Sequence, residues 1–316
     1  MTPPFRFAVN VAKAETGAAW RATARRAEEL GYDALLIVDH LGRQLAPVPA
    51  LAAAADATTR LRVGSFVFSN DYRNPVMLAK ELATLDVLSG GRLEIGLGAG
   101  WMTSDYAKLG IRYDPPAVRV ERLFEATLLM QRLLTEDEVD HRGKHYTVKV
   151  ALWPRPVQRP RPPFMIGGGG PRIQAFAARN AEIVALSPQV DERGRPKLAT
   201  LAAGAVERRV ARIRELAGER AASLELNAIV FDAAVANDES GIAARLEAFF
   251  KGTAASAIRT LAGGGPDESP FFLYGSRGAI VRRLRAQRER LGISYVAIPG
   301  AAMEDFAPVV KELAGT

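Results

Sequence analysis

The sequence predicts an α/β protein, a (β/α)8 TIM barrel with an insertion after the fourth strand. Strand-like and helix-like segments alternate, and the expected strands end near residues 10, 40, 70 and 100. Each unit therefore takes about 30 residues, the length of a right-handed parallel crossover unit. Eight such strands fit a chain of 316 residues, which we treat as one domain over residues 1–316. A doubly wound open sheet is the competing fold.

The hydrophobic pattern of the first hundred residues defines four of these strands. Residues 34–40 are a continuous apolar run of strand length, which is typical of a strand covered on both faces. Residues 16–30 are amphipathic and end at Gly31, a usual residue at a helix C-terminus. The strands expected here are 5–10, 34–40, 61–70 and 92–98, and the helices are 16–30, 49–58 and 75–88.

The alternation stops after Trp101, and about 60 residues pass before the next clear strand. We assign approximately residues 102–162 to the insertion. It holds a long helix over 116–134, a turn between short strands over 140–150 and a proline-rich connector from residue 154. The remaining expected strands are 163–166, 182–186, 224–231 and 295–299, and the remaining helices begin near 171 or cover about 198–217, 242–251, 279–291 and 306–313.

Composition excludes several classes of protein. The chain is 48% hydrophobic and 24% charged, and no segment reaches the ~18 uncharged apolar residues of a spanning helix. Cysteine is absent, which excludes disulfides and thiolate chemistry. The first ten residues lack the apolar run of a signal peptide. We therefore expect a cytoplasmic protein that does not bind membranes.

The net charge of +7 favours anionic partners. The densest basic run, residues 282–290, has apolar residues among its arginines at helical spacing, which indicates the solvated face of a surface helix. No motif of a nucleic-acid-binding fold accompanies it. We expect a small-molecule substrate and no nucleic-acid partner.

Two glycine clusters follow expected strands. In residues 93–101 the spacing G-x-G-x-x-G fails, because the third glycine would fall on Trp101 or Thr103. We interpret these glycines as letting a ligand approach the backbone at a strand end. Residues 166–172 place four glycines and Arg172 before an expected helix, which predicts an anion site at the helix N-terminus, most simply for phosphate.

Histidine occurs at positions 40, 141 and 145 only. His141 and His145 have the spacing of a metal pair on a helix, but Gly143 lies between them in an expected turn, so we predict no metal site. His40 falls where the second strand should end, on the face of a barrel that carries chemistry. A structural histidine with satisfied hydrogen bonds is the alternative there.

Short motifs after the strands resemble those of a known family. They are Val38–Leu41, Arg73–Pro75, Leu82–Arg92, Gly96–Trp101, Leu109–Ile111, His145–Tyr146, Pro156–Pro160, Ile166–Arg172 and Tyr274–Ser276. In order and spacing, from residue 5 to about 300, the chain resembles the luciferase-like monooxygenase superfamily. Within it, the chain is most similar to the class of oxidoreductases that depend on the deazaflavin coenzyme F420.

The resemblance implies a cofactor across the carboxyl ends of the strands. Asp39 and His40 would lie near its ring, with Ser69, Ala99 and Gly100 in contact with it. The residues implied to hold the phosphate are Gly169, Gly170, Arg172 and Ile173. Related barrels carry a non-proline cis peptide behind the ring, which alignment on Gly64 places at Phe66–Val67. We also expect a homodimer.

The resemblance implies hydride transfer between coenzyme F420 and a small organic substrate. Trp101 stands where the sugar-phosphate dehydrogenases of the class carry a glutamate acid/base, so we expect Trp101 to line the substrate pocket. His40 is then the candidate for moving the accompanying proton, and Asp39 for orienting the cofactor. Two alternatives stay open: a monooxygenase that uses flavin mononucleotide (FMN), and a cofactor-binding protein without turnover.

Overall fold

The computed structural model describes residues 3–191, 196–235, 239–249 and 269–316. Eight strand positions form one closed parallel barrel, because β3 pairs with both β2 and β5. The predicted (β/α)8 barrel is therefore confirmed. In hydrogen-bonded order the strands are β3 (Arg62–Ser65), β2 (Ala34–Ile37), β1 (Arg6–Asn10), β13 (Ile293–Pro299), β10 (Glu225–Ile229), β9 (Ile183–Leu186), β8 (Phe164–Gly167) and β5 (Leu93–Gly98), with β4 (Phe68–Ser69) beside β5.

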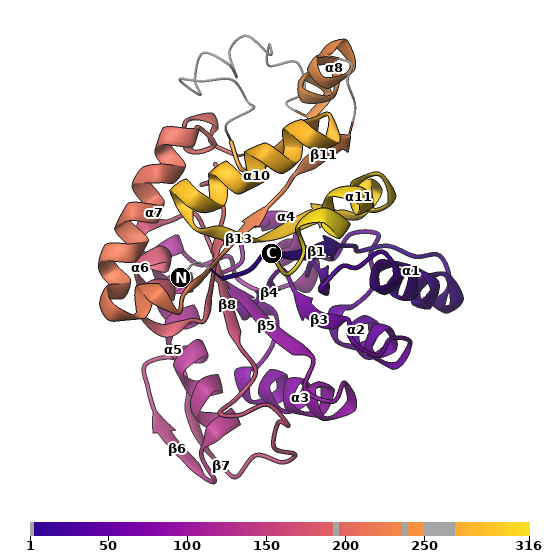
Figure 1. Cartoon of the computed structure of the whole chain (residues 1–316). Helices are drawn as coiled ribbons and strands as arrows, with labels where there is room; N and C mark the ends of the chain where they lie inside the picture. The colour runs from indigo at the N-terminus through magenta and orange to yellow at the C-terminus, as the bar shows by residue number, and fades with distance from the viewer. Residues whose placement is uncertain (1–2, 192–195, 236–238, 250–268) are drawn as a thin grey trace.

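Helices surround the barrel in chain order (Figure 1). They are α1 (Gly17–Glu29), α2 (Pro47–Asp56), α3 (Pro75–Leu88), α5 (Pro116–Thr135), α6 (Pro171–Asn180), α7 (Ala203–Ala217), α10 (Arg277–Leu291) and α11 (Met303–Leu313), with α8 (Glu239–Phe249) outside the ring. Their starts follow local chemistry. At the start of α3, for example, the Asn74 side chain accepts a hydrogen bond from the amide of Val76, and Pro75 takes the first helical position.

The predicted insertion is only partly an addition to the barrel. Between β5 and β8 the chain forms α4 (Thr103–Leu109), α5, and an antiparallel hairpin of β6 (Val139–Arg142) and β7 (Thr147–Val150). Helix α5 packs against α3 and α6 and so takes the ordinary ring position between them (Figure 1). The additions are thus α4, the hairpin and the connector that leads to β8.

Some boundaries differ from the expected ones. The strand expected over 34–40 ends at Ile37, which leaves Asp39 and His40 in the loop after it. The strand expected over 61–70 is two short strands, β3 and β4, on either side of the Phe66–Val67 peptide. A second, parallel pair, β11 (Asp232–Val235) and β12 (Phe272–Gly275), was not predicted. Residues 250 and 251 of the helix expected over 242–251 lie outside the described residues.

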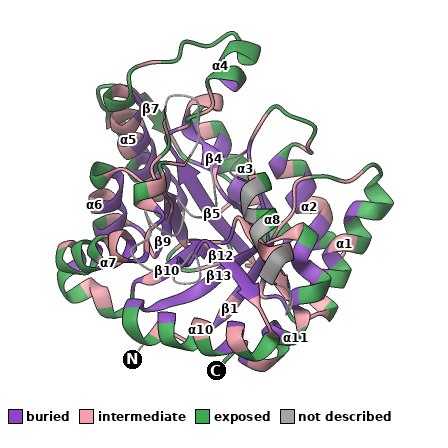
Figure 2. Cartoon of the chain, turned by 90° about the horizontal axis from the view of Figure 1, so that it is seen from above, coloured by how far each residue is buried: buried purple, intermediate pink, exposed green. Residues whose placement is uncertain are grey.

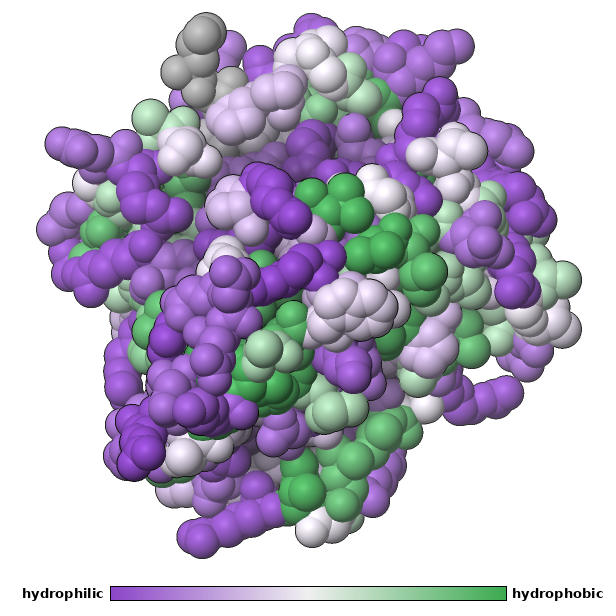
Figure 3. Space-filling model, turned by 90° about the horizontal axis from the view of Figure 1, so that it is seen from below, coloured by the Kyte–Doolittle hydropathy of each residue, from purple (hydrophilic) through white to green (hydrophobic). Residues whose placement is uncertain are grey.

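Apolar residues fill two layers. The larger layer lies between the strands and the helix ring, and a smaller cluster fills the barrel interior, with Ala8, Leu36, Met165 and Ala297 among its members. The surface seen from below is mainly hydrophilic, with apolar side chains gathered in separate patches (Figure 3). No helix in the described part of the chain combines the length and apolar composition needed to cross a membrane.

A charged cluster closes the barrel at the amino ends of its strands. The buried Glu94 side chain accepts hydrogen bonds from Arg6, from Arg62 Nε at 2.7 Å and from the Tyr295 hydroxyl at 3.0 Å. Burial alone would raise the pKa of Glu94, but Arg6 and Arg62 outweigh burial and hold that pKa below its ordinary value. Glu225 also pairs with Arg6, at 2.7 Å, yet burial raises its pKa to about 7.

Candidate functional site

The carboxyl ends of the strands form a mouth at the end of the barrel opposite to the two chain termini, and α4 stands beside it (Figure 2). His40 follows β2, and Trp101 follows β5. The two rings contact each other edge to face, with centroids 5.3 Å apart. His40 Nδ1 lies 2.8 Å from Oδ2 of Asp105, a residue in the first turn of α4. The mouth therefore holds a carboxylate–histidine pair against an indole ring.

Asp105 was missed in the sequence analysis. Its side chain is fully buried, whereas His40 keeps a quarter of its side chain exposed. The Tyr72 hydroxyl donates a second hydrogen bond to Oδ2 of Asp105, at 3.4 Å, and Lys108 Nζ lies 3.9 Å from Oδ1. Since an ionised carboxylate only accepts hydrogen bonds, Nδ1 of His40 is the nitrogen that donates to it. Nε2 is then the nitrogen left for a ligand.

Asp39 links two loops at the mouth of the barrel, whereas its neighbour His40 pairs with Asp105. The Asp39 carboxylate receives two hydrogen bonds from Arg73, at 2.5 and 2.9 Å, and one from the amide of Ser69 at 3.0 Å. These contacts tie the loop after β2 to the end of β4. Asp39 thus supports the wall on which Ser69 lies, and its predicted contact with a cofactor stays a prediction.

The Phe66–Val67 peptide is cis, as predicted. The glycines of β5 fit around this segment. A Cβ on Gly96 would overlap the carbonyl oxygen of Ser65, and one on Gly98 would lie 2.7 Å from the Val67 side chain. Our interpretation that these glycines admit a ligand was therefore wrong for Gly96 and Gly98, because the neighbouring strand occupies the space.

This packing makes Gly96 sensitive to a small change. We expect Gly96→Ala to lower the free energy of unfolding by roughly 1–3 kcal/mol, the usual cost of overpacking a core. The measurement is urea denaturation followed by circular dichroism. Gly42→Ala is the matched control, because nothing lies within 4 Å of the position that the added methyl group would take, and its expected change is near zero. Equal stability of the two variants would contradict this account of β5.

Ser69, Ala99 and Gly100 meet at the mouth. Gly100 has a φ of +72°, and a Cβ there would lie 2.6 Å from Ser69 Oγ and would also overlap the Tyr106 hydroxyl. Arg119 donates hydrogen bonds to the carbonyl oxygens of Ala99 and Gly100. Ser69 Oγ is buried and makes no hydrogen bond of good geometry to a described residue, although the Tyr72 hydroxyl is nearby. A polar group of a ligand would satisfy it.

The second glycine cluster leads from β8 into α6. A Cβ on Gly168 would lie 2.8 Å from Ile173, and one on Gly169 would overlap the carbonyl of Pro188, so packing alone requires these two glycines. Gly170 has open space around it and precedes the first residue of α6. Arg172 is exposed in the first turn. The amides of this turn, with Arg172, are suited to an anion.

His141 and His145 lie on the β6–β7 hairpin and bind it to α5. His141 Nε2 is 3.0 Å from Glu125 Oε1, and the same carboxylate accepts hydrogen bonds from the amides of His145 and Tyr146. Burial raises the pKa of Glu125, but these hydrogen bonds outweigh it and the pKa lies below its ordinary value. The described residues contain no group of three or more ligands placed to hold a metal ion.

The closed barrel with its polar mouth defines a protein of the (β/α)8 class in which ligands bind at the carboxyl ends of the strands. The chain belongs to the luciferase-like monooxygenase family, whose profile matches residues 1–292. The resemblance found in the sequence is thereby confirmed.

Several known proteins are similar to this chain. A protein of Intrasporangium calvum named F420-dependent glucose-6-phosphate dehydrogenase is 33% identical over 168 residues, 50% of each chain. An uncharacterized protein of Sinorhizobium fredii, y4wF, is 34% identical over 167 residues, 51% of this chain and 48% of that one. The chain therefore spans about half the length of the curated relatives it matches.

Solved structures share the fold over nearly the whole chain. The coenzyme F420-dependent tetrahydromethanopterin reductase of Methanopyrus kandleri superposes with a TM-score of 0.75 at 20% identity, covering 98% of this chain and 99% of that one. The long-chain alkane monooxygenase LadA superposes with a TM-score of 0.77 at 18% identity, covering 99% and 92%. At these identities the likeness concerns the fold.

Proposed function

We propose that the protein is an oxidoreductase that transfers a hydride between coenzyme F420 and a small organic substrate. The observation that carries this proposal is the His40–Asp105 pair, with Nδ1 and Oδ2 2.8 Å apart, at the mouth of a barrel of this family. Hydride transfer to a carbonyl or from an alcohol must be matched by a proton, and His40 is suited to move it. The F420-dependent names of several curated relatives support the choice of cofactor.

The residues at the mouth fit such a cofactor. The unsatisfied Ser69 hydroxyl would hydrogen-bond a polar edge of its ring, and the absence of a side chain at Gly100 lets Ser69 and Tyr106 pack close to the backbone there. Gly170, Arg172 and the amide of Ile173 would hold its phosphate at the start of α6. When bound, a deazaflavin supplies a ring carbon that accepts or gives a hydride, and the protein supplies orientation and exclusion of water.

The surroundings of His40 favour a substrate with an apolar body over a sugar phosphate. Leu41, Trp101 and Tyr113 are each more than one third exposed, and the Tyr113 hydroxyl donates to the carbonyl of Trp101. Two arginines of the mouth are already engaged, since Arg73 pairs with Asp39, and Arg119 donates to backbone carbonyls. A phosphate would therefore have to displace existing contacts of these arginines.

An FMN-dependent monooxygenase is the second candidate, favoured by the family to which the chain belongs and by the fold it shares with LadA. A cofactor-binding protein without turnover is the third. Reduced flavin reacts readily with oxygen, whereas a deazaflavin does not. Oxygen consumption by the reduced, cofactor-loaded protein therefore separates the first two candidates. Tight binding without turnover across a broad substrate panel would support the third.

Cofactor affinity gives the direct test of the proposal. Coenzyme F420 carries a phosphodiester and a glutamate tail, so it is more anionic than FMN and suits a protein of net charge +7 with Arg172 at a helix start. We expect F420 to bind at least about tenfold more tightly, a difference of about 1.4 kcal/mol. Fluorescence titration of the purified protein with each cofactor measures it. Equal or reversed affinities would overturn the F420 assignment.

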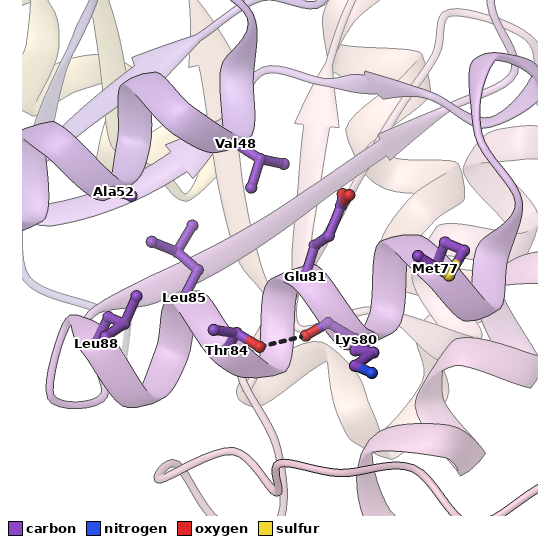
Figure 4. A pocket seen from close by; sticks show the side chains of 8 residues that line it. All are labelled: Val48, Ala52, Met77, Lys80, Glu81, Thr84, Leu85 and Leu88. Carbon is purple, nitrogen blue, oxygen red and sulfur yellow. Dashed lines mark hydrogen bonds between the residues drawn. The ribbon is translucent and has the colours of Figure 1, made fainter.

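We further propose that the protein forms a homodimer through the outer face of α2 and α3. A groove between these helices is lined by Val48, Ala52, Leu85 and Leu88, and Figure 4 shows Val48 and Leu85 directed into it. Met77 and Leu88 at its ends are 56% and 68% exposed. Lys80 and Glu81 also line this groove. Across a two-fold axis, Lys80 of one protomer could pair with Glu81 of its partner.

Light scattering coupled to size-exclusion chromatography tests the dimer. The chain should elute at twice its 34.1 kDa mass, and Leu88→Glu should shift it to the monomer. Leu128→Glu is the control, because Leu128 is an exposed leucine on α5, away from the groove. A monomeric wild-type protein at micromolar concentration would contradict the proposal.

A further inference from the structure

We propose that Asp105 is a positioning residue that fixes the protonation geometry of His40, so that Nε2 of the imidazole is the atom that exchanges a proton with the substrate. The effect of Asp105 on catalysis rests on the proposed function, whereas the geometry of the Asp105–His40 pair can be tested without it. The sequence analysis assigned Asp39, next to His40 in the chain, to orienting the cofactor and named no acid to support His40. The structure places such an acid, Asp105, 65 positions further along the chain.

Contacts other than the one with His40 also hold Asp105 in its place. Two hydrogen bonds hold its helix, α4, against the segment after β4, and in each of them a tyrosine of one segment donates to an aspartate of the other. Tyr72 donates to Asp105 at 3.4 Å, and Tyr106 donates to Asp71 at 2.9 Å. The rings of Tyr72 and Tyr106 also pack edge to face, with centroids 5.5 Å apart. Gly110, with a φ of +66°, ends the helix.

The burial of Asp105 strengthens its hydrogen bond with Nδ1 of His40. The carboxylate is fully buried, and a hydrogen bond to an ionised group in such surroundings is stronger than one between neutral groups. Neutral imidazole carries one N–H, and a carboxylate oxygen 2.8 Å from Nδ1 favours the proton there. The lone pair on Nε2 is then free. The edge-to-face contact with Trp101 restricts rotation of the His40 ring.

The consequence for the reaction is a defined proton path. In the direction of alcohol oxidation, Nε2 would take the proton as the substrate O–H bond breaks, and a carbonyl would form as the adjacent C–H bond breaks. Bound F420 would supply the acceptor for the hydride, which carries the two electrons that the substrate loses. In the direction of reduction, the imidazolium returns the proton from Nε2 to the carbonyl oxygen. Asp105 contacts neither substrate nor cofactor in this scheme.

The test that needs no cofactor is side-chain ¹⁵N NMR of the purified protein at pH 8 with labelled histidine. The chain has three histidines, so a His40→Gln spectrum identifies the His40 signals. We expect the neutral His40 ring to carry its proton on Nδ1. In Asp105→Asn the uncharged amide should weaken the preference for Nδ1–H, and a larger share of the neutral ring should carry its proton on Nε2. Finding Nε2–H in the wild-type protein would overturn the proposal, whatever the variant does.

Kinetics supply the second readout. With F420 and an alcohol or ketone that the wild-type protein turns over, Asp105→Asn should lower kcat by about 10²-fold or more while the Kd for F420 changes less than about threefold. Asp137→Asn, at a fully exposed acid, is the matched control and should change neither. A normal kcat in Asp105→Asn would overturn the positioning role. Absence of F420 turnover in the wild-type protein would overturn the proposed function and leave the NMR result standing.

Discussion

His40→Gln is expected to lower turnover by about 10²–10⁴-fold, the usual size of a general acid–base contribution. The imidazole is partly exposed at the mouth and is held by a buried carboxylate. Glutamine keeps a hydrogen-bonding side chain of similar size but does not exchange a proton near neutral pH. Steady-state kinetics with F420 over a range of substrate concentrations measure the change.

The cofactor-binding surface serves as the internal control for this prediction. Contacts other than those of His40 hold two residues of this surface in place: Asp39 accepts from the amide of Ser69, and Arg119 donates to the carbonyl of Gly100. We therefore expect His40→Gln to leave the Kd for F420 within about threefold of the wild-type value. If His40→Gln abolished F420 binding while turnover per bound cofactor stayed normal, His40 would be a binding residue and the proton would come from elsewhere.

The barrel was predictable because its signals are local. Strands such as β2 and β9 are buried on both faces, so their sequences are continuous apolar runs, and crossover helices of regular length separate them. Helix α4 has only seven residues, too few for hydrophobic periodicity to show. The β11–β12 pair joins segments 40 positions apart in register, a relation that no local pattern records.

The candidate site was predictable only in part for the same reason. His40 could be placed by its position after a strand, and the cis peptide at Phe66–Val67 followed from the resemblance. Asp105 lies on the unpredicted α4, so its approach to His40 could not be seen. One signal was available: Asp105 is an acid four residues after Trp101, on a loop expected at the mouth.

Glycine shows how one pattern supports two explanations. A glycine after a strand is equally consistent with an approaching ligand and an approaching neighbour, because in both cases a Cβ would be in the way. Gly96 and Gly98 proved to face the segment around Val67, whereas Gly170 faces open space. The sequence carries no information on which atoms occupy the position that the missing side chain leaves.

The largest expected effect on stability is at the opposite end of the barrel. Glu94→Gln should lower the free energy of unfolding by about 3–5 kcal/mol, the usual cost of removing one partner from a buried ion pair. The carboxylate is 1% exposed and lies between two guanidinium groups, those of Arg6 and Arg62. Without its charge these cations would repel each other in a partly buried site. Urea denaturation at pH 7 measures the loss.

Glu225→Gln is the matched control within the same cluster. The pKa of Glu225 is raised to about 7, so at pH 7 it is only partly ionised, and we expect its replacement to cost less than about 1 kcal/mol. A carboxyl whose pKa is raised in the folded protein stabilises it at low pH, and that contribution is lost as the pH rises through 7. Glu225→Gln should therefore remove the fall in stability that Glu225 causes as the pH rises from about 4.5 to about 7, whereas Glu94→Gln should stay destabilised at neutral pH. If the two variants lost equal free energy of unfolding at pH 7, the prediction that Glu94 contributes more to stability than Glu225 would be wrong.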